Sequence, residues 1–147
     1  MTNTTITVKE LLRTKSREIW SVSPHATAYE ALEIMADKNI GALLVMEDGR
    51  LAGIFSERDY ARKVILKGKS SKDTAVSELM TTSVVYVTPD NTIEDCMGMM
   101  TLKQIRHLPV LNNGRLEGIL TLGDVVKRII SEQEFTIRQL EYYVYNG

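Results

Sequence analysis

The stretch GRLAGIFSERD at residues 49–59 returns as GRLEGILTLGD at residues 114–124, and this repetition decides the fold. The two stretches share both glycines, the Arg-Leu pair, an isoleucine and the closing aspartate. In each, a serine or threonine stands three positions before that aspartate. A repeat at a fixed period indicates a duplicated structural unit, so the chain is expected to contain two copies of one fold.

The similarity extends outward, because residues 19–65 align with residues 84–130 at a shift of 65 positions without a gap. Identical pairs outside the two stretches include Val22 with Val87, Pro24 with Pro89, Thr27 with Thr92, Lys38 with Lys103, Ile40 with Ile105 and Val45 with Val110. Upstream, VKELLRT (8–14) echoes VSELMTT (76–82) at a shift of 68, which leaves three extra residues near 15–18 in the first copy (68 − 65 = 3). We expect each copy to start with this short amphipathic turn.

Each copy has the pattern of a βαββα unit. Strands are expected at 19–24, 42–47 and 51–56, and again at 84–89, 107–112 and 116–121. Thr27 and Thr92 are predicted helix N-caps, each followed by an apolar helical stripe. Asp48-Gly49 and Asn113-Gly114 predict hairpin turns, and last helices are expected over 58–66 and 124–130.

The expected architecture is an α+β fold in which the two copies pack as a pseudo-symmetric pair, because one copy has a single sheet face to bury. The predicted boundaries are a first repeat over 8–67, a polar linker over 68–75, a second repeat over 76–130 and a C-terminal helix over 131–147. In that tail Ile137, Leu140 and Val144 keep a helical spacing, so the helix is expected to cover apolar surface. A dimer contact and packing within the chain are both open.

Composition excludes several classes of function. The net charge is -1, without the basic stripe that a dedicated nucleic-acid binder needs. No apolar run approaches the roughly 18 residues that span a bilayer, and the N-terminus lacks the layout of a secretory signal, so a soluble cytoplasmic protein is expected. Cys96 is the single cysteine, and two separated histidines form no ligand cluster, which argues against a disulfide or a metal site.

The hydroxyl and aspartate that close each repeated stretch allow two interpretations. Ser56 with Asp59, and Thr121 with Asp124, have the spacing of a capping box, which satisfies free N–H groups at the start of a helix. The same spacing places a carboxylate where it can accept from the hydroxyls of a ribose, near backbone donors suited to phosphate. Capping and ligand binding can share these residues.

With its doubled unit, its Asp-Gly or Asn-Gly hairpin and its Gly-x-x-[Ser/Thr]-x-x-Asp motif, the chain resembles the CBS-domain pair, or Bateman module, over residues 8–130. The resemblance implies a stand-alone regulatory pair that binds AMP, ATP, NAD(H) or S-adenosylmethionine in clefts between the repeats and that often dimerises. It also implies that Asp59 and Asp124 hold the ribose, while Ser56 and Thr121 lie near the phosphate.

The charges around the two aspartates differ between the copies. Arg106 and His107 precede a strand of the second copy, where AMP-sensing members of the family direct basic residues at the phosphate held with the first aspartate. Their counterparts are Gly41 and Ala42, so we expect a favoured site at Asp59 and a weaker one at Asp124. A surface arginine and a packed histidine remain the alternatives.

Other contacts to the ligand follow from the same comparison of copies. Arg58 could add charge at the phosphate and is replaced by Gly123 in the second copy, although it is also an ordinary surface residue. Adenine is expected against apolar side chains and backbone near Val22 and Pro24 in one copy and near Val87 and Pro89 in the other. A core role for these four residues is compatible with that expectation.

The function expected from the sequence is therefore a regulatory sensor of adenosine ligands, with AMP as the first candidate. Its response would pass to a homodimer or to an effector protein through conformation. No nucleophile with a base and no paired carboxylates suggest catalysis, so an enzyme is not expected. A ligand-free dimerisation scaffold is the alternative.

Overall fold

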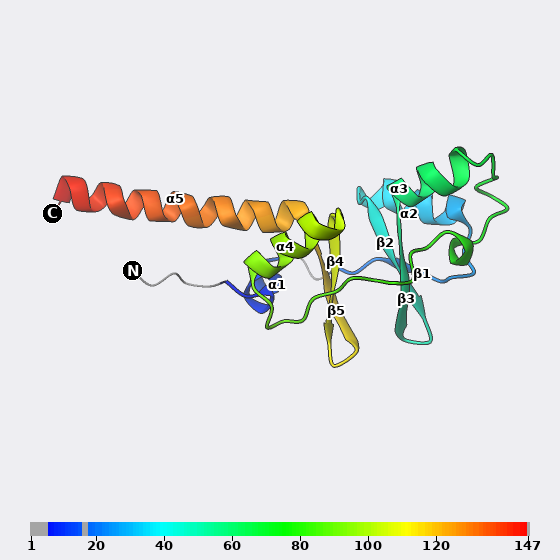
Figure 1. The fold of residues 1–147 in the computed structure, drawn as a ribbon, viewed down its shortest axis with the longest axis horizontal. Coiled ribbons are helices and arrows are strands. Elements are labelled where there is room, and N and C mark those ends of the chain that lie inside the picture. The colour runs from blue at the N-terminus through cyan, green and yellow to red at the C-terminus, as the bar shows by residue number, and fades with distance from the viewer. Residues whose placement is uncertain (1–5, 16–17, 147) are drawn as a thin grey trace. The chain divides into compact units, whose positions relative to one another are not determined.

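The computed structural model describes residues 6–15 and 18–146, and within these the side chains up to Val144 (Figure 1). The chain divides into two compact units, each built from separate segments. The unit that contains Asp59, here the Asp59 unit, comprises Glu18–Tyr86 and Leu111–Glu117. The unit that contains Asp124, here the Asp124 unit, comprises the described part of 1–17 together with Val87–Val110 and Gly118–Gly147.

The Asp59 unit is built on a three-stranded sheet of order β1-β2-β3. These strands are β1 (Ser21–Val22), β2 (Ala42–Glu47) and β3 (Arg50–Ser56). β1 runs parallel to β2, and β2 pairs antiparallel with β3 across a tight turn. At that turn Asp48 and Gly49 have φ angles of 51° and 77°, as the predicted two-residue hairpin requires.

Helices complete the Asp59 unit. They are α2 (Ala28–Lys38), α3 (Glu57–Tyr60) with a π-helical turn at Ala61–Ile65, and the 3-10 turn η2 (Val76–Glu78). The buried side chains of these elements form one core with the sheet. That core contains Val22, Ala28, Ala31, Met35, Leu43, Val45, Phe55, Val64, Val76 and Leu79.

The strands β4 (His107–Asn112) and β5 (Arg115–Thr121) form the hairpin of the second copy, and the Asp124 unit contains the first part of β4 and the last part of β5. Its helices are α1 (Val8–Thr14), α4 (Ile93–Lys103) and α5 (Leu122–Asn146). Buried apolar side chains come from all three helices and from both strands, among them Leu11, Cys96, Leu108, Leu120 and Val125. The helix and strand content and the repeated hairpins confirm the mixed α and β class predicted from the sequence.

The predicted helix caps are confirmed in both copies. Thr27 accepts from the Glu30 N–H at 3.1 Å, and Thr92 accepts from the Asp95 N–H at the same distance. In each case the acidic residue also accepts from the backbone of the threonine, which completes a capping box. The two central helices therefore start at equivalent positions for the same local reason.

The short turn that precedes each copy packs with the other copy, which corrects the expectation that each unit begins with its own turn. The Val8 and Lys9 N–H groups donate to the carbonyls of Asn91 and Pro89 in the Asp124 unit, at 2.8 and 3.0 Å. In the Asp59 unit the Val76 and Ser77 N–H groups donate to the carbonyls of Ala26 and Pro24, at 2.7 and 2.9 Å. Each unit thus combines the body of one copy with the turn that precedes the other copy.

The second glycine of the repeated motif, which is Gly53 in one copy and Gly118 in the other, explains how the exchanged turns fit against the strands. A Cβ atom at Gly53 would lie 2.8 Å from both Met80 Sδ and the Thr81 carbonyl oxygen. At the equivalent Gly118 it would lie 2.9 Å from Leu12 Cδ2. The absence of a side chain at these two positions therefore lets the exchanged segment approach the strand closely.

Several predicted elements differ from the structure. The strand expected at 19–24 is reduced to Ser21–Val22, and the one expected at 84–89 is a single parallel bridge from Val87 to Val110. The helix expected at 58–66 changes at Ala61 from α-helical to π-helical hydrogen bonding. The helix expected over 124–130 and the C-terminal helix expected over 131–147 belong to one element, because α5 runs unbroken from Leu122 to Asn146 (Figure 1).

Among the described residues, no helix combines the length and the apolar character that crossing a bilayer requires. α5 is long enough, but acidic and basic side chains recur along it. Several of its apolar side chains are exposed, namely Val126, Ile130, Phe135, Ile137, Leu140 and Val144. The helical spacing that the sequence predicted for this tail is confirmed.

Candidate functional site

The first candidate carboxylate, Asp59, is held by the start of α3. The Ser56 N–H donates to Asp59 Oδ2 at 3.0 Å, and the Asp59 N–H donates to Ser56 Oγ at 3.2 Å. The Ser56 hydroxyl also donates to Oδ2, at 3.1 Å. The capping interpretation of the motif is therefore confirmed at this copy, and it fixes the orientation of the carboxylate.

Lys63 supplies a cation beside Asp59. Its Nζ lies 3.4 Å from Asp59 Oδ1 and donates to the Leu79 carbonyl at 2.9 Å. Lys63 belongs to the π-helical turn, so it is four residues beyond the aspartate on a locally widened helix. Such turns occur often at functional sites. The Asp59 side chain is 16% exposed, so it is not fully covered by the protein.

The second candidate carboxylate, Asp124, has the same cap. The Thr121 N–H donates to Asp124 Oδ2 at 2.8 Å, and the Asp124 N–H donates to Thr121 Oγ1 at 3.1 Å. The motif therefore has one local geometry in both copies, at the end of β3 and at the end of β5. The cation beside Asp124, however, comes from a different part of the chain than the cation beside Asp59.

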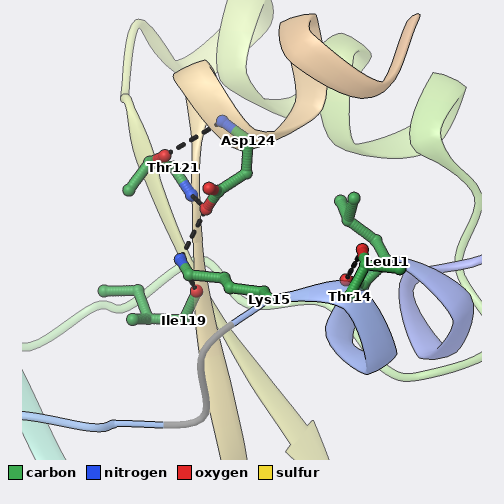
Figure 2. A network of polar contacts seen from close by, with 6 residues as sticks. All are labelled: Leu11, Thr14, Lys15, Ile119, Thr121 and Asp124. Atoms are coloured by element: carbon green, nitrogen blue, oxygen red, sulfur yellow. Dashed lines mark hydrogen bonds and ion pairs between the residues drawn. The ribbon is translucent and has the colours of Figure 1, made fainter. Parts of the chain in front are cut away.

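At Asp124 the cation comes from Lys15, just after α1 (Figure 2). Lys15 Nζ lies 2.5 Å from Asp124 Oδ2 and 2.6 Å from the Ile119 carbonyl oxygen. The side chains of Lys15 and Asp124 are 23% and 27% exposed, so this ion pair is partly shielded from water. Burial raises the pKa of Asp124, but hydrogen bonds from Lys15 and from the Thr121 backbone outweigh it and hold that pKa below 3.8.

A carboxylate in this setting can cap a helix and bind a ligand at the same time. Its two oxygens offer about four lone-pair positions. At Asp59 the capping bonds all fall on Oδ2, while Oδ1 faces the Lys63 ammonium. A vicinal diol, such as that of ribose, could donate to the remaining positions. The geometry is thus compatible with both interpretations that the sequence left open.

The basic residues predicted to contact phosphate lie in different units. Arg58 is on α3, one residue before Asp59, and its side chain is exposed. Arg106 is exposed and His107 is half-buried, and both precede or begin β4 in the Asp124 unit. The Arg106 carbonyl accepts from the Leu122 N–H at 2.9 Å, as Gly41 does from Glu57 at 3.0 Å. Their contact with a phosphate beside Asp59 stays a prediction.

The residues expected around adenine have structural roles. Val22, Pro24 and Val87 are buried, and Pro89 is half-buried. The carbonyls of Pro24 and Pro89 accept from the exchanged turns, so the prolines help to anchor those turns. The core interpretation is confirmed for Val22, Pro24 and Val87, and the contact of all four residues with a base stays a prediction.

Sequence reasoning missed both lysines. Lys15 lies in the segment near 15–18 where the first copy has three extra residues, and no motif marks it as a site residue. Lys63 stands four residues after Asp59, a spacing that brings side chains together on a helix. Its counterpart Arg128 stands four residues after Asp124 but pairs with Glu132 instead, at 3.3 Å. The spacing alone therefore could not identify the cation at each carboxylate.

The described residues contain no group of three or more His, Cys, Asp or Glu side chains placed to hold a metal ion. Cys96 lies inside α4, and burial raises the pKa of its thiol to about 11. A thiol with that pKa is a poor nucleophile near neutral pH. This agrees with the sequence interpretation of Cys96 as a small core side chain.

Its fold and its motifs define the protein as a tandem α+β module in which each copy has one aspartate that completes a capping box. Residues 6–66 and 76–131 match the family model described as the CBS domain. Because these segments cover most of the chain, the protein belongs to the CBS-domain family and carries a CBS pair, a regulatory module.

Individual relatives agree with this assignment. The chain is 34% identical over 151 residues to the CBS domain-containing protein CBSX3, mitochondrial, of Arabidopsis thaliana, which covers 96% of this chain and 73% of that protein. It is 41% identical to the crystal structure of the CBS-domain containing protein ATU1752 from Agrobacterium tumefaciens, with a TM-score of 0.79 and coverage of 83% and 98%. The CBS domain pair of protein MJ0100, solved with 5′-methylthioadenosine and S-adenosylmethionine, shares the fold at 24% identity and a TM-score of 0.76, covering 88% and 98%.

Proposed function

We propose that this CBS pair is a regulatory sensor of an adenosine nucleotide, with the principal site centred on Asp59. The observation that carries the proposal is the Asp59 carboxylate itself, which the Ser56 cap fixes and which remains partly exposed. A preorganised acceptor of this kind suits the two hydroxyls of a ribose, because no side-chain rearrangement is needed before binding.

The charge distribution supports AMP as the first candidate ligand. Arg58 adjoins Asp59 on α3, and Arg106 with His107 is carried by the second copy, whereas Gly41, Ala42 and Gly123 occupy the matching positions. A guanidinium binds phosphate with two parallel hydrogen bonds, so these arginines suit a monophosphate. ATP, NAD(H) and S-adenosylmethionine stay as further candidates that share the adenosine group.

The adenine of the ligand would contact Val22 and Pro24 near Asp59, and Val87 and Pro89 near Asp124. In the proposal, ligand binding favours one conformation of the protein over another. This change of conformation is passed on through a homodimer or to an effector protein. That the module itself catalyses no reaction, and that it works in the cytoplasm, remain parts of the proposal. A CBS pair of the same fold binds adenosine compounds in MJ0100, and the ligand class proposed here rests on this chain's own residues.

A thermal-shift titration tests the proposal against its alternative, a ligand-free dimerisation scaffold. AMP, ATP, NADH and S-adenosylmethionine are added separately to the full chain over a range of concentrations. A ligand that binds the folded state raises the melting temperature progressively with its concentration. A rise with AMP supports the sensor, while no shift with any of the four compounds supports the scaffold.

A further inference from the structure

The two carbonyls at equivalent positions of β3 and β5 have different hydrogen-bond donors. In the Asp59 unit the Ile54 carbonyl accepts from the Thr81 N–H at 2.9 Å, and the Ile54 N–H donates to the Thr81 carbonyl at 3.0 Å. In the Asp124 unit the equivalent Ile119 carbonyl accepts from the Lys15 ammonium at 2.6 Å. A side-chain cation therefore takes the place that main chain occupies in the other copy.

This replacement puts a positive charge on the second aspartate. The same Lys15 ammonium that binds Ile119 lies 2.5 Å from Asp124 Oδ2, the oxygen that also accepts from the Thr121 N–H (Figure 2). At Asp59 the nearest cation, Lys63, faces the other oxygen, Oδ1, at 3.4 Å and is more exposed. The two aspartates are therefore equivalent in backbone setting but differ in how tightly a lysine holds them.

We propose that the Lys15 ammonium neutralises the Asp124 carboxylate, weakens it as an acceptor for ribose and so determines which of the two copies binds nucleotide. The inference rests on the proposed function, because it assigns Asp124 the same ribose role as Asp59. A diol that binds Asp124 must compete for a carboxylate whose charge the Lys15 ammonium already neutralises. Charge-assisted hydrogen bonds are the stronger class, so this competition disfavours the ligand.

The position of Lys15 in the sequence explains why only one copy carries this device. Lys15 lies in the segment near 15–18, where the first copy has three residues in excess between its turn and its first strand. Thr14 ends α1, where its hydroxyl donates to the Leu11 carbonyl at 3.0 Å, and Lys15 follows in extended conformation. Leu79 is the counterpart of Leu11, and its carbonyl accepts from Lys63 instead. This segment therefore places a lysine beside Asp124, whereas the lysine beside Asp59 comes from the π-helical turn that follows α3.

Lys15→Met tests the inference, because methionine keeps an unbranched chain without the charge. AMP is titrated calorimetrically into four forms of the full chain: wild type, Lys15→Met, Asp59→Ala and the double variant Lys15→Met/Asp59→Ala. Lys9→Met, at an exposed position on the same helix, is the matched control. Circular dichroism establishes that each variant is folded.

The expected result is one AMP per chain in the wild type and in Lys9→Met, and a second AMP in Lys15→Met. In the Asp59→Ala background, removal of Lys15 should strengthen AMP binding about ten- to a hundredfold, the range of a charge-assisted hydrogen bond. One AMP per chain in both wild type and Lys15→Met would overturn the inference and leave the Asp59 site standing. Weaker binding in Lys15→Met/Asp59→Ala than in Asp59→Ala would also overturn it, since Lys15 would then assist the ligand.

The same titrations separate this inference from the proposed function. Binding in Lys15→Met but not in wild type would support the inference while contradicting the proposed Asp59 site. Absence of AMP binding in every form would contradict both. In a further variant, Lys15→Met/Asp124→Ala, the second AMP should be lost, which locates the released site at the carboxylate.

Discussion

Lys15 and Asp124 are 109 positions apart in the sequence and are joined by a contact of 2.5 Å between Nζ and Oδ2. The exchange of turns makes this contact possible, because α1 packs with the second copy and delivers the residue after it to the end of β5. The corresponding turn at Val76–Glu78 packs with the first copy but delivers main chain to Ile54. The two copies therefore share a fold while their carboxylates have different partners.

The ion pair has a direct consequence for the titration of Asp124. Its pKa is held below the ordinary value although burial alone would raise it, so removal of the cation in Lys15→Met should raise that pKa. Carbon-13 NMR of the aspartate carboxyl groups as a function of pH measures the change. Asp95 is the internal control, because its lowered pKa comes from the Thr92 backbone and the Asn91 side chain. An unchanged Asp124 together with an unchanged Asp95 would contradict the contact.

The same pair should also make stability depend on pH. A group whose pKa is lowered on folding contributes stability above its unfolded pKa, and this contribution disappears as the pH falls through the folded value. Lys15→Met should therefore destabilise the protein by about 1–2 kcal/mol at pH 7, and by progressively less below pH 3.8. Urea unfolding at several pH values measures it. A loss of equal size at every pH would point to lost packing instead.

The exchanged turns predict unequal effects of alanine at the motif glycines. Gly53→Ala should destabilise by about 1–3 kcal/mol, because the new Cβ would meet the Thr81 backbone oxygen at 2.8 Å. Gly118→Ala should cost less, since its neighbour at 2.9 Å is the end of the flexible Leu12 side chain. Gly98→Ala, in the middle of α4 with nothing within 4 Å, is the control and should stabilise by up to about 1 kcal/mol. Urea unfolding ranks the three, and the reverse order of Gly53 and Gly118 would contradict the close approach.

Arg106 provides a test of the phosphate contact. If its guanidinium binds the phosphate of AMP, Arg106→Ala should lower the affinity for AMP about tenfold. The affinity for adenosine should stay unchanged, because adenosine lacks the phosphate. Arg115→Ala, at an exposed position of β5, is the matched control. Calorimetry with both ligands gives the comparison. Equal losses for AMP and adenosine would instead indicate a structural role of Arg106.

Much of the fold could be predicted because its determinants are local. The threonine caps, the two Asp-Gly or Asn-Gly hairpins and the serine or threonine capping boxes each depend on residues within a few positions of one another. The exchange of turns could not be predicted, because the match of 8–14 with 76–82 shows that the turns are equivalent but not which copy each one contacts. That choice depends on packing at Gly53 and Gly118 between segments distant in sequence.

For the site, the sequence located both carboxylates but not their cations. Asp59 and Asp124 stand out because they close a repeated motif, whereas Lys15 and Lys63 occupy unrelated positions in the two copies.

The strand expected at 84–89 is longer in the prediction than in the structure. Its β-branched composition favours a strand, yet in the structure Val87 alone bridges to β4.

Calorimetric titration of AMP into wild type, Asp59→Ala, Asp124→Ala and Asp95→Ala tests the central claim most directly. Asp95 closes the capping box of α4 and has no proposed contact with a ligand, so Asp95→Ala controls for the loss of a helix cap. The account predicts one AMP per chain in wild type, Asp124→Ala and Asp95→Ala, and no measurable high-affinity binding in Asp59→Ala. Undiminished binding in Asp59→Ala, or loss of binding in Asp124→Ala alone, would contradict it.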